Sequence, residues 1–80
     1  MPCFVYMLRC ADGTFYTGWT TDVAARERAH NLGRGAKYTA SRRPVRVVHV
    51  EEHDSRSSAQ KREAEIKRWP REKKAALLPR

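Results

Sequence analysis

Cysteines, acidic residues and long apolar runs are all scarce in this sequence, and each scarcity excludes a class of protein. The two cysteines, Cys3 and Cys10, lie seven positions apart in one expected strand, where an odd spacing points side chains to opposite faces. They therefore cannot bond to each other. The longest apolar run, Phe4 to Leu8, is too short for a membrane span or a signal peptide. We expect a cytoplasmic protein with no disulfide and no membrane contact.

The shortage of acidic residues leaves a strongly basic chain. Nine Asp and Glu oppose 17 Lys and Arg, so the formal net charge is +8. Most of the basic residues are arginines, whose planar guanidinium pairs bidentately with phosphate. A solubilising surface or an arginine-rich codon bias would also give this composition. The charge favours a nucleic-acid partner over either alternative.

A length of 80 residues allows one domain, residues 1–80, with a thin core. Alternation, turn residues and helix caps predict an α+β fold in the order β-β-α-β-α-α, a three-stranded antiparallel sheet with helices packed on it. The segment 37–43 is basic and shows no clear period. The expected strands cover residues 4–8, 14–19 and 45–50, and the expected helices cover about 22–31, 58–68 and 70–78.

The loop between the first two strands fixes which side chains share a face. Residues 11–13 suit a three-residue hairpin loop that ends in a left-handed Gly13. Tyr6 then pairs with Gly18, and Tyr16 emerges on the same face as Tyr6. Because glycine has no side chain, we expect a shallow open space beside the Tyr6 phenol. The alternative is that both tyrosines are ordinary strand aromatics and that Gly18 marks a bulge.

The first expected helix carries three polar residues on one face. Asp22, Arg26 and His30 recur every fourth residue, so they lie one above another. Arg26 and His30 could present a fixed cation and a proton donor or acceptor to one phosphate. On the spacing alone, an exposed Asp22–Arg26 ion pair beside a solvated His30 is favoured.

The second expected helix turns a carboxylate toward the core. Glu63 lies about 60° from Ile66 on the helical wheel, within the stripe that Ala59 and Ile66 define. A carboxylate there needs a partner, because burying it unpaired costs several kcal/mol. The partner is a divalent cation, an arginine from elsewhere, or Lys67 one turn along the helix.

Together, these residues resemble the GIY-YIG nuclease superfamily, and the resemblance extends over nearly the whole chain. The length is similar to that of small stand-alone bacterial GIY-YIG proteins. The matching positions, in chain order, are Phe4-Val5-Tyr6, Tyr16-Thr17-Gly18, the helical Asp22, Arg26 and His30, and the late Glu63.

The resemblance implies a metal-dependent endonuclease that hydrolyses phosphodiesters with a single Mg²⁺ or Mn²⁺. Glu63 would hold the ion. Arg26 would stabilise charge on the phosphate, and Tyr6 would act as the general base. Arg26 or metal-bound water would lower the pKa of that phenol. Tyr16 would orient the water or phosphate, and His30 would take or relay a proton.

The expected substrate is DNA, or RNA, held through its phosphates by a monomer or weak homodimer. No recognition helix is apparent, so we expect no sequence specificity from this domain. The resemblance then implies a structure-directed enzyme of DNA repair or recombination. The alternatives are a non-catalytic nucleic-acid-binding module with the same fold and a small protein-interaction domain. The candidate phosphate contacts are Arg34, Lys37, Arg42, Arg43, Lys61 and Arg62.

Overall fold

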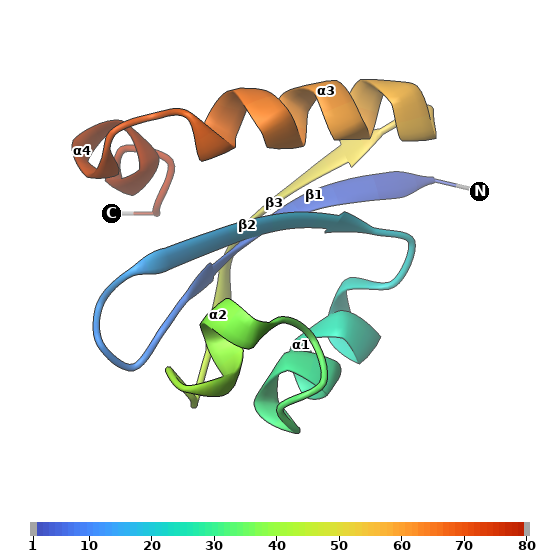
Figure 1. The fold of residues 1–80 in the computed structure, drawn as a ribbon. Coiled ribbons are helices and arrows are strands. Elements are labelled where there is room, and N and C mark those ends of the chain that lie inside the picture. The colour runs from blue at the N-terminus through green and yellow to red at the C-terminus, as the bar shows by residue number, and fades with distance from the viewer. Residues whose placement is uncertain (1, 80) are drawn as a thin grey trace.

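The computed structural model describes residues 2–79 and has the predicted α+β architecture (Figure 1). The expected order is confirmed, with one addition: a single-turn helix, α2, lies in the basic segment that showed no clear period. β3 continues three residues beyond the expected strand, and α4 stops three residues short of the expected helix. The elements are β1 (Cys3–Arg9), β2 (Phe15–Thr20), α1 (Val23–Asn31), α2 (Lys37–Ala40), β3 (Arg46–His53), α3 (Arg56–Lys67) and α4 (Arg71–Ala75).

The three strands form one antiparallel sheet in the order β2-β1-β3. Tyr6 pairs with Gly18 and Leu8 with Tyr16, as the three-residue loop requires. Gly13 has φ +84°, the left-handed conformation for which a glycine was expected there. The predicted register is therefore confirmed. Since β2 is an edge strand, side chains from both faces of the sheet can meet around it.

Helices cover both faces of the sheet. In Figure 1, α3 and α4 lie on one side, and α1 and α2 lie on the other. Cys3 and Val5 pack with α3, whereas Tyr6, Leu8 and Cys10 face the opposite way. Both cysteines are buried and free, and they belong to the hydrophobic clusters on opposite faces of the sheet, as predicted. Within residues 2–79, no helix combines the length and apolar character that a membrane span needs.

Local capping explains where the helices begin. The Asp22 carboxylate accepts the Ala25 amide N–H at 3.0 Å and caps α1. The predicted Asp22–Arg26 ion pair is therefore wrong: no such pair occurs in the part of the chain that the structure describes. Ser55 caps α3 by accepting from the Ser58 N–H at 3.1 Å. At the other end of α1, Gly33 has φ +83° and ends the helix.

Thr17 offers a test of the packing between the sheet and α3. Its Oγ1 is buried, and it has no hydrogen-bond partner among the described residues. A buried hydroxyl without a partner retains its desolvation cost. We expect Thr17→Val, which replaces the hydroxyl with a methyl of similar size, to stabilise the fold by about 1 kcal/mol. Urea unfolding monitored by circular dichroism would measure this, and a destabilised variant would contradict it.

Candidate active site

The site is centred on a buried phenol. Tyr6 is 1% exposed, and its hydroxyl lies 2.9 Å from His30 Nε2. The ring crosses Gly18, where a Cβ would stand only 2.5 Å from the phenol oxygen. The predicted open space beside Tyr6 is therefore wrong, because the phenol itself fills it. Gly18 is required here because a side chain would collide with Tyr6.

His30 is buried rather than solvated, so that expectation is also wrong. It is 1% exposed, and its Nδ1 lies 2.7 Å from Thr39 Oγ1 on α2. Burial, and then the nearby charge of Arg26, lowers the pKa of His30. The imidazole is thus held neutral between two hydroxyl groups, one on β1 and one on α2.

Tyr16 connects this pair to the other face of the sheet. Its ring centroid lies 5.1 Å from that of His30. The Lys67 ammonium, on α3, lies 5.8 Å from the Tyr16 ring centroid. Because Tyr16 is on edge strand β2, groups from α1 and α3 approach it from opposite sides.

Glu63 reaches the same edge of the sheet, although α3 packs on the face opposite Tyr6. Its carboxylate lies 3.7 Å from the Lys67 ammonium, so the predicted Glu63–Lys67 pair is present. The negative charge of Glu63 also contributes to the raised pKa of Tyr6. The Glu63 side chain is 20% exposed and that of Lys67 is 48% exposed, so the carboxylate is held by a lysine that can move into solvent.

The protonation of Tyr6 differs from expectation. Burial is the largest effect and raises the pKa of the phenol, and the charges of Tyr16 and Glu63 act in the same direction. The charge of Arg26 lowers the pKa, as predicted, but it does not outweigh burial. In this arrangement Tyr6 is a neutral phenol at physiological pH.

The donor set around Glu63 suits a hard cation with few protein ligands. In the part of the chain described, no three His, Cys, Asp or Glu side chains gather to form a metal cluster. Mg²⁺ is commonly held by one or two carboxylates, with water and substrate phosphate completing its octahedron. A single half-buried carboxylate beside a displaceable lysine fits this mode of binding, and it does not fit a closed structural metal site.

The candidate phosphate contacts fall into two groups. Three arginines are engaged internally: Arg42 with Asp12 and Tyr38, Arg43 with the Ala40 carbonyl, and Arg62 with both Glu51 oxygens. Within residues 2–79, no hydrogen bond or ion pair holds the charged groups of Arg34, Lys37 and Lys61. A phosphate backbone could engage the second group without breaking existing contacts.

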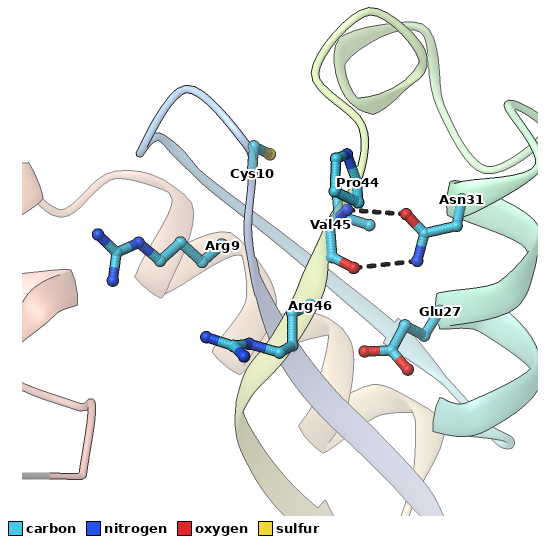
Figure 2. A pocket seen from close by; sticks show the side chains of 7 residues that line it. All are labelled: Arg9, Cys10, Glu27, Asn31, Pro44, Val45 and Arg46. Atoms are coloured by element: carbon cyan, nitrogen blue, oxygen red, sulfur yellow. Dashed lines mark hydrogen bonds between the residues drawn. The ribbon is translucent and has the colours of Figure 1, made fainter.

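A cavity of about 500 Å³ opens elsewhere, between α1 and the start of β3 (Figure 2). Figure 2 shows the Asn31 amide bonded to both backbone groups of Val45, at 2.7 and 2.9 Å. Glu27 accepts the Val47 N–H at 2.8 Å. These polar groups join α1 to β3, and neither Tyr6 nor Tyr16 lines the cavity.

Sequence reasoning missed two residues at the site, Thr39 and Gly35. Thr39 is fully buried against His30, and a Cβ on Gly35 would lie 2.2 Å from His30 Nδ1. The only sequence indication was a glycine and a threonine in an otherwise basic loop. Their importance depends on His30 being buried, which the exposed helix face did not predict.

Glu51 provides a test of stability against pH. Hydrogen bonds from Arg62 are the main reason that the pKa of Glu51 falls to about 2. Because the folded pKa is depressed, this contribution is present above the ordinary value of 4.5 and is lost as pH falls toward 2. Glu51→Gln should cost about 2–3 kcal/mol at pH 7 and less at pH 3.

Urea unfolding at both pH values checks this, with the exposed neighbour Glu52→Gln as the control. Equal losses for Glu51→Gln at pH 7 and pH 3 would contradict the assignment.

Comparison with known proteins finds similar proteins over nearly the whole length of the chain. Residues 2–76 match the family described as the GIY-YIG catalytic domain. A UPF0213 protein of Haloquadratum walsbyi is 55% identical over 92% of this chain and 83% of its own length. One from Staphylococcus aureus is 52% identical over 94% of this chain and 92% of its own length.

Two solution NMR structures are also similar. A UPF0213 protein from Bacillus halodurans has a TM-score of 0.61 and 45% identity, covering 96% of this chain and 82% of that one. A protein from E. faecalis has a TM-score of 0.63 and 46% identity, covering 92% and 79%. The two tyrosines, the α1 arginine and histidine, and the α3 glutamate thus lie within a matched catalytic domain, and the chain belongs to the GIY-YIG family.

Proposed function

We propose that this protein is a divalent-metal-dependent endonuclease that hydrolyses phosphodiester bonds in DNA. The observation that carries the proposal is the buried Tyr6–His30 contact with Tyr16 beside it, together with the Glu63–Lys67 pair whose ammonium approaches the Tyr16 ring. They come from both faces of the sheet, and fold stability alone does not require a buried phenol–imidazole pair next to a guanidinium and a carboxylate. Membership of a catalytic-domain family supports a nuclease-like role.

Glu63 would hold a Mg²⁺ or Mn²⁺ ion, which when bound supplies Lewis-acid stabilisation of the phosphate and the leaving oxygen. Lys67, which now neutralises Glu63, would turn out to solvent or contact the substrate. Tyr16, between Lys67 and His30, is placed to orient the attacking water or the phosphate.

Arg26 is exposed, and its guanidinium is close enough to the Tyr6 phenol to affect its pKa. A phosphate in contact with Arg26 therefore lies beside Tyr6. Arg26 would stabilise the charge that builds on the phosphoryl oxygens. Tyr6 and His30 form the proton-handling pair, since their polar atoms are already in hydrogen-bond contact.

Substrate selection would rest on shape and charge. The unengaged cations Arg34, Lys37 and Lys61 are suited to backbone phosphates, which carry no sequence information. We infer that branched, nicked or damaged DNA in repair or recombination is the substrate, with RNA as the second choice. The cytoplasmic location and the monomer or weak homodimer remain predictions.

One observation favours a second candidate, a non-catalytic nucleic-acid-binding module. Burial raises the pKa of Tyr6, and a phenol that stays protonated is a poor base. Such a module would bind DNA with a steep salt dependence and leave it intact.

A cleavage assay of the wild type and of an Arg26 variant distinguishes the endonuclease from the non-catalytic binding module. Single-stranded, nicked and branched DNA, and a matched RNA, would be incubated with the protein and Mn²⁺. We expect cleavage by the wild type and a loss of about 10²- to 10³-fold in kcat/KM for Arg26→Ala. Arg28→Ala, an exposed arginine on the same helix, serves as the matched control and should cut normally. DNA binding without cleavage by the wild type would establish the module instead.

A further inference from the structure

We propose that Thr39 is a positioning residue that fixes the tautomer of His30, so that Nε2 is the proton acceptor for the Tyr6 phenol. The inference rests on the proposed function for its catalytic consequence, but the tautomer itself is a property of the protein alone. It assigns a purpose to α2, the single-turn helix that the sequence did not predict.

The assignment follows from counting donors and acceptors along the buried chain of contacts. Thr39 Oγ1 lies 3.1 Å from the Ala36 carbonyl oxygen and 2.7 Å from His30 Nδ1. A carbonyl oxygen only accepts, and a threonine hydroxyl has a single proton to donate. If that proton goes to Ala36, the short contact to His30 must be an Nδ1–H donating to Thr39. His30 Nε2 is then unprotonated and accepts the Tyr6 O–H at 2.9 Å.

The opposite tautomer leaves groups unpaired. If Thr39 donated to Nδ1, its 3.1 Å contact with the Ala36 oxygen would join two acceptors. His30 Nε2–H would then donate to Tyr6, and the phenol proton would lack an acceptor among the described residues. Tyr6 is buried, so that loss would cost the full desolvation penalty of the hydroxyl. The Nδ1–H tautomer satisfies every group at once.

Gly35 makes this contact possible. The backbone passes so close to the imidazole that a Cβ on Gly35 would lie 2.2 Å from Nδ1. Gly35, Ala36 and Thr39 thus form a close-fitting support around one ring nitrogen. Such second-layer hydrogen bonds decide which nitrogen of a histidine carries the proton.

The consequence for the reaction is a balanced proton path. As the Tyr6 O–H bond breaks, its proton moves to His30 Nε2, and the resulting imidazolium still donates from Nδ1 to Thr39. The phenolate oxygen then takes a proton from the attacking water as the new P–O bond forms and the P–O bond to the leaving oxygen breaks. His30 later gives up its extra proton to solvent, the leaving oxygen takes up one proton from solvent, and both side chains return to their starting states. A phenol that is neutral at rest can therefore still act as the base.

The test uses ¹⁵N-histidine NMR of the full chain, in which the two tautomers give distinct nitrogen shifts. We expect His30 to be Nδ1-protonated in the wild type at pH 7.5. Thr39→Val removes the acceptor and should shift His30 toward the Nε2–H form. It should also lower kcat by about tenfold to a hundredfold with little change in KM. Thr39→Ser, which restores the hydroxyl, should recover both properties.

Thr17→Val is the matched control, since it also replaces a buried threonine hydroxyl, but one that forms no hydrogen bond among the described residues. It should leave the His30 nitrogen shifts unchanged. If Thr39→Val fails to fold, the wild-type and Thr39→Ser spectra still decide the tautomer. An Nε2-protonated His30 in the wild type, or an unchanged tautomer in folded Thr39→Val, would overturn the proposal. A wild type that holds the Nδ1–H tautomer but cuts no nucleic acid would refute the endonuclease and support the role of Thr39.

Discussion

Replacing Glu63 with glutamine is expected to abolish cleavage, lowering kcat/KM by at least about 10³-fold. Glutamine keeps the size of the side chain but removes the negative charge, and a neutral amide is a poor ligand for Mg²⁺. The fold should tolerate the change, because the half-exposed Lys67 that pairs with Glu63 can be solvated. Cleavage of branched and nicked DNA with Mg²⁺ or Mn²⁺ would be measured alongside urea unfolding.

The control for this prediction is Glu65→Gln, two residues along the same helix. Glu65 is exposed and pairs with Arg62, away from the tyrosines. It should retain cleavage within about twofold. If Glu63→Gln cuts as fast as Glu65→Gln, Glu63 is not the metal ligand.

Gly18→Ala should both destabilise the protein and inactivate it. The added Cβ would lie 2.5 Å from the Tyr6 oxygen and 2.7 Å from the ring carbon that bears it. Tyr6 is buried and held by His30, so neither residue can move aside without breaking that hydrogen bond. We expect a loss of about 2–3 kcal/mol in the free energy of unfolding and at least about 10²-fold in kcat.

A double-mutant cycle checks the cause of this effect. Tyr6→Leu removes the atoms that the new methyl group would strike. In that background, Gly18→Ala should cost less than about 1 kcal/mol. An equal cost in both backgrounds would mean that the glycine is required by the β2 backbone and not by Tyr6.

The features predictable from sequence were those set by local chemistry. The loop that ends at Gly13 fixed the register of β1 and β2, and this register placed Tyr6 and Tyr16 on one face. Asp22 and Gly33 marked the ends of α1 for the same reason, since caps act within a few residues. These parts of the fold needed no knowledge of distant contacts.

The features that escaped prediction depend on tertiary contacts. β3 continues beyond the expected strand through Glu51, Glu52 and His53, where Arg62 on α3 binds the Glu51 carboxylate. Without that partner, the same residues suggested a strand that ends earlier. Similarly, α2 forms around the contact between Thr39 and His30, and neither residue carries a periodic pattern.

The candidate site shows the same division. The helical spacing put Arg26 and His30 on one face but gave no indication that His30 would be buried. Once His30 is buried, it takes the Tyr6 hydroxyl as its partner, and the phenol fills the space over Gly18. The pKa of Tyr6 rises for the same reason, because burial outweighs the favourable charge of Arg26.

Mn²⁺ titration of the ¹⁵N-labelled protein would show whether Glu63 binds a divalent ion next to the two tyrosines. Paramagnetic Mn²⁺ broadens the signals of nearby nuclei whether or not a substrate is present. We expect selective broadening around Tyr6, Tyr16 and Glu63 in the wild type, and its disappearance in Glu63→Gln. Broadening centred elsewhere, or persisting unchanged in Glu63→Gln, would show that Glu63 does not bind the ion.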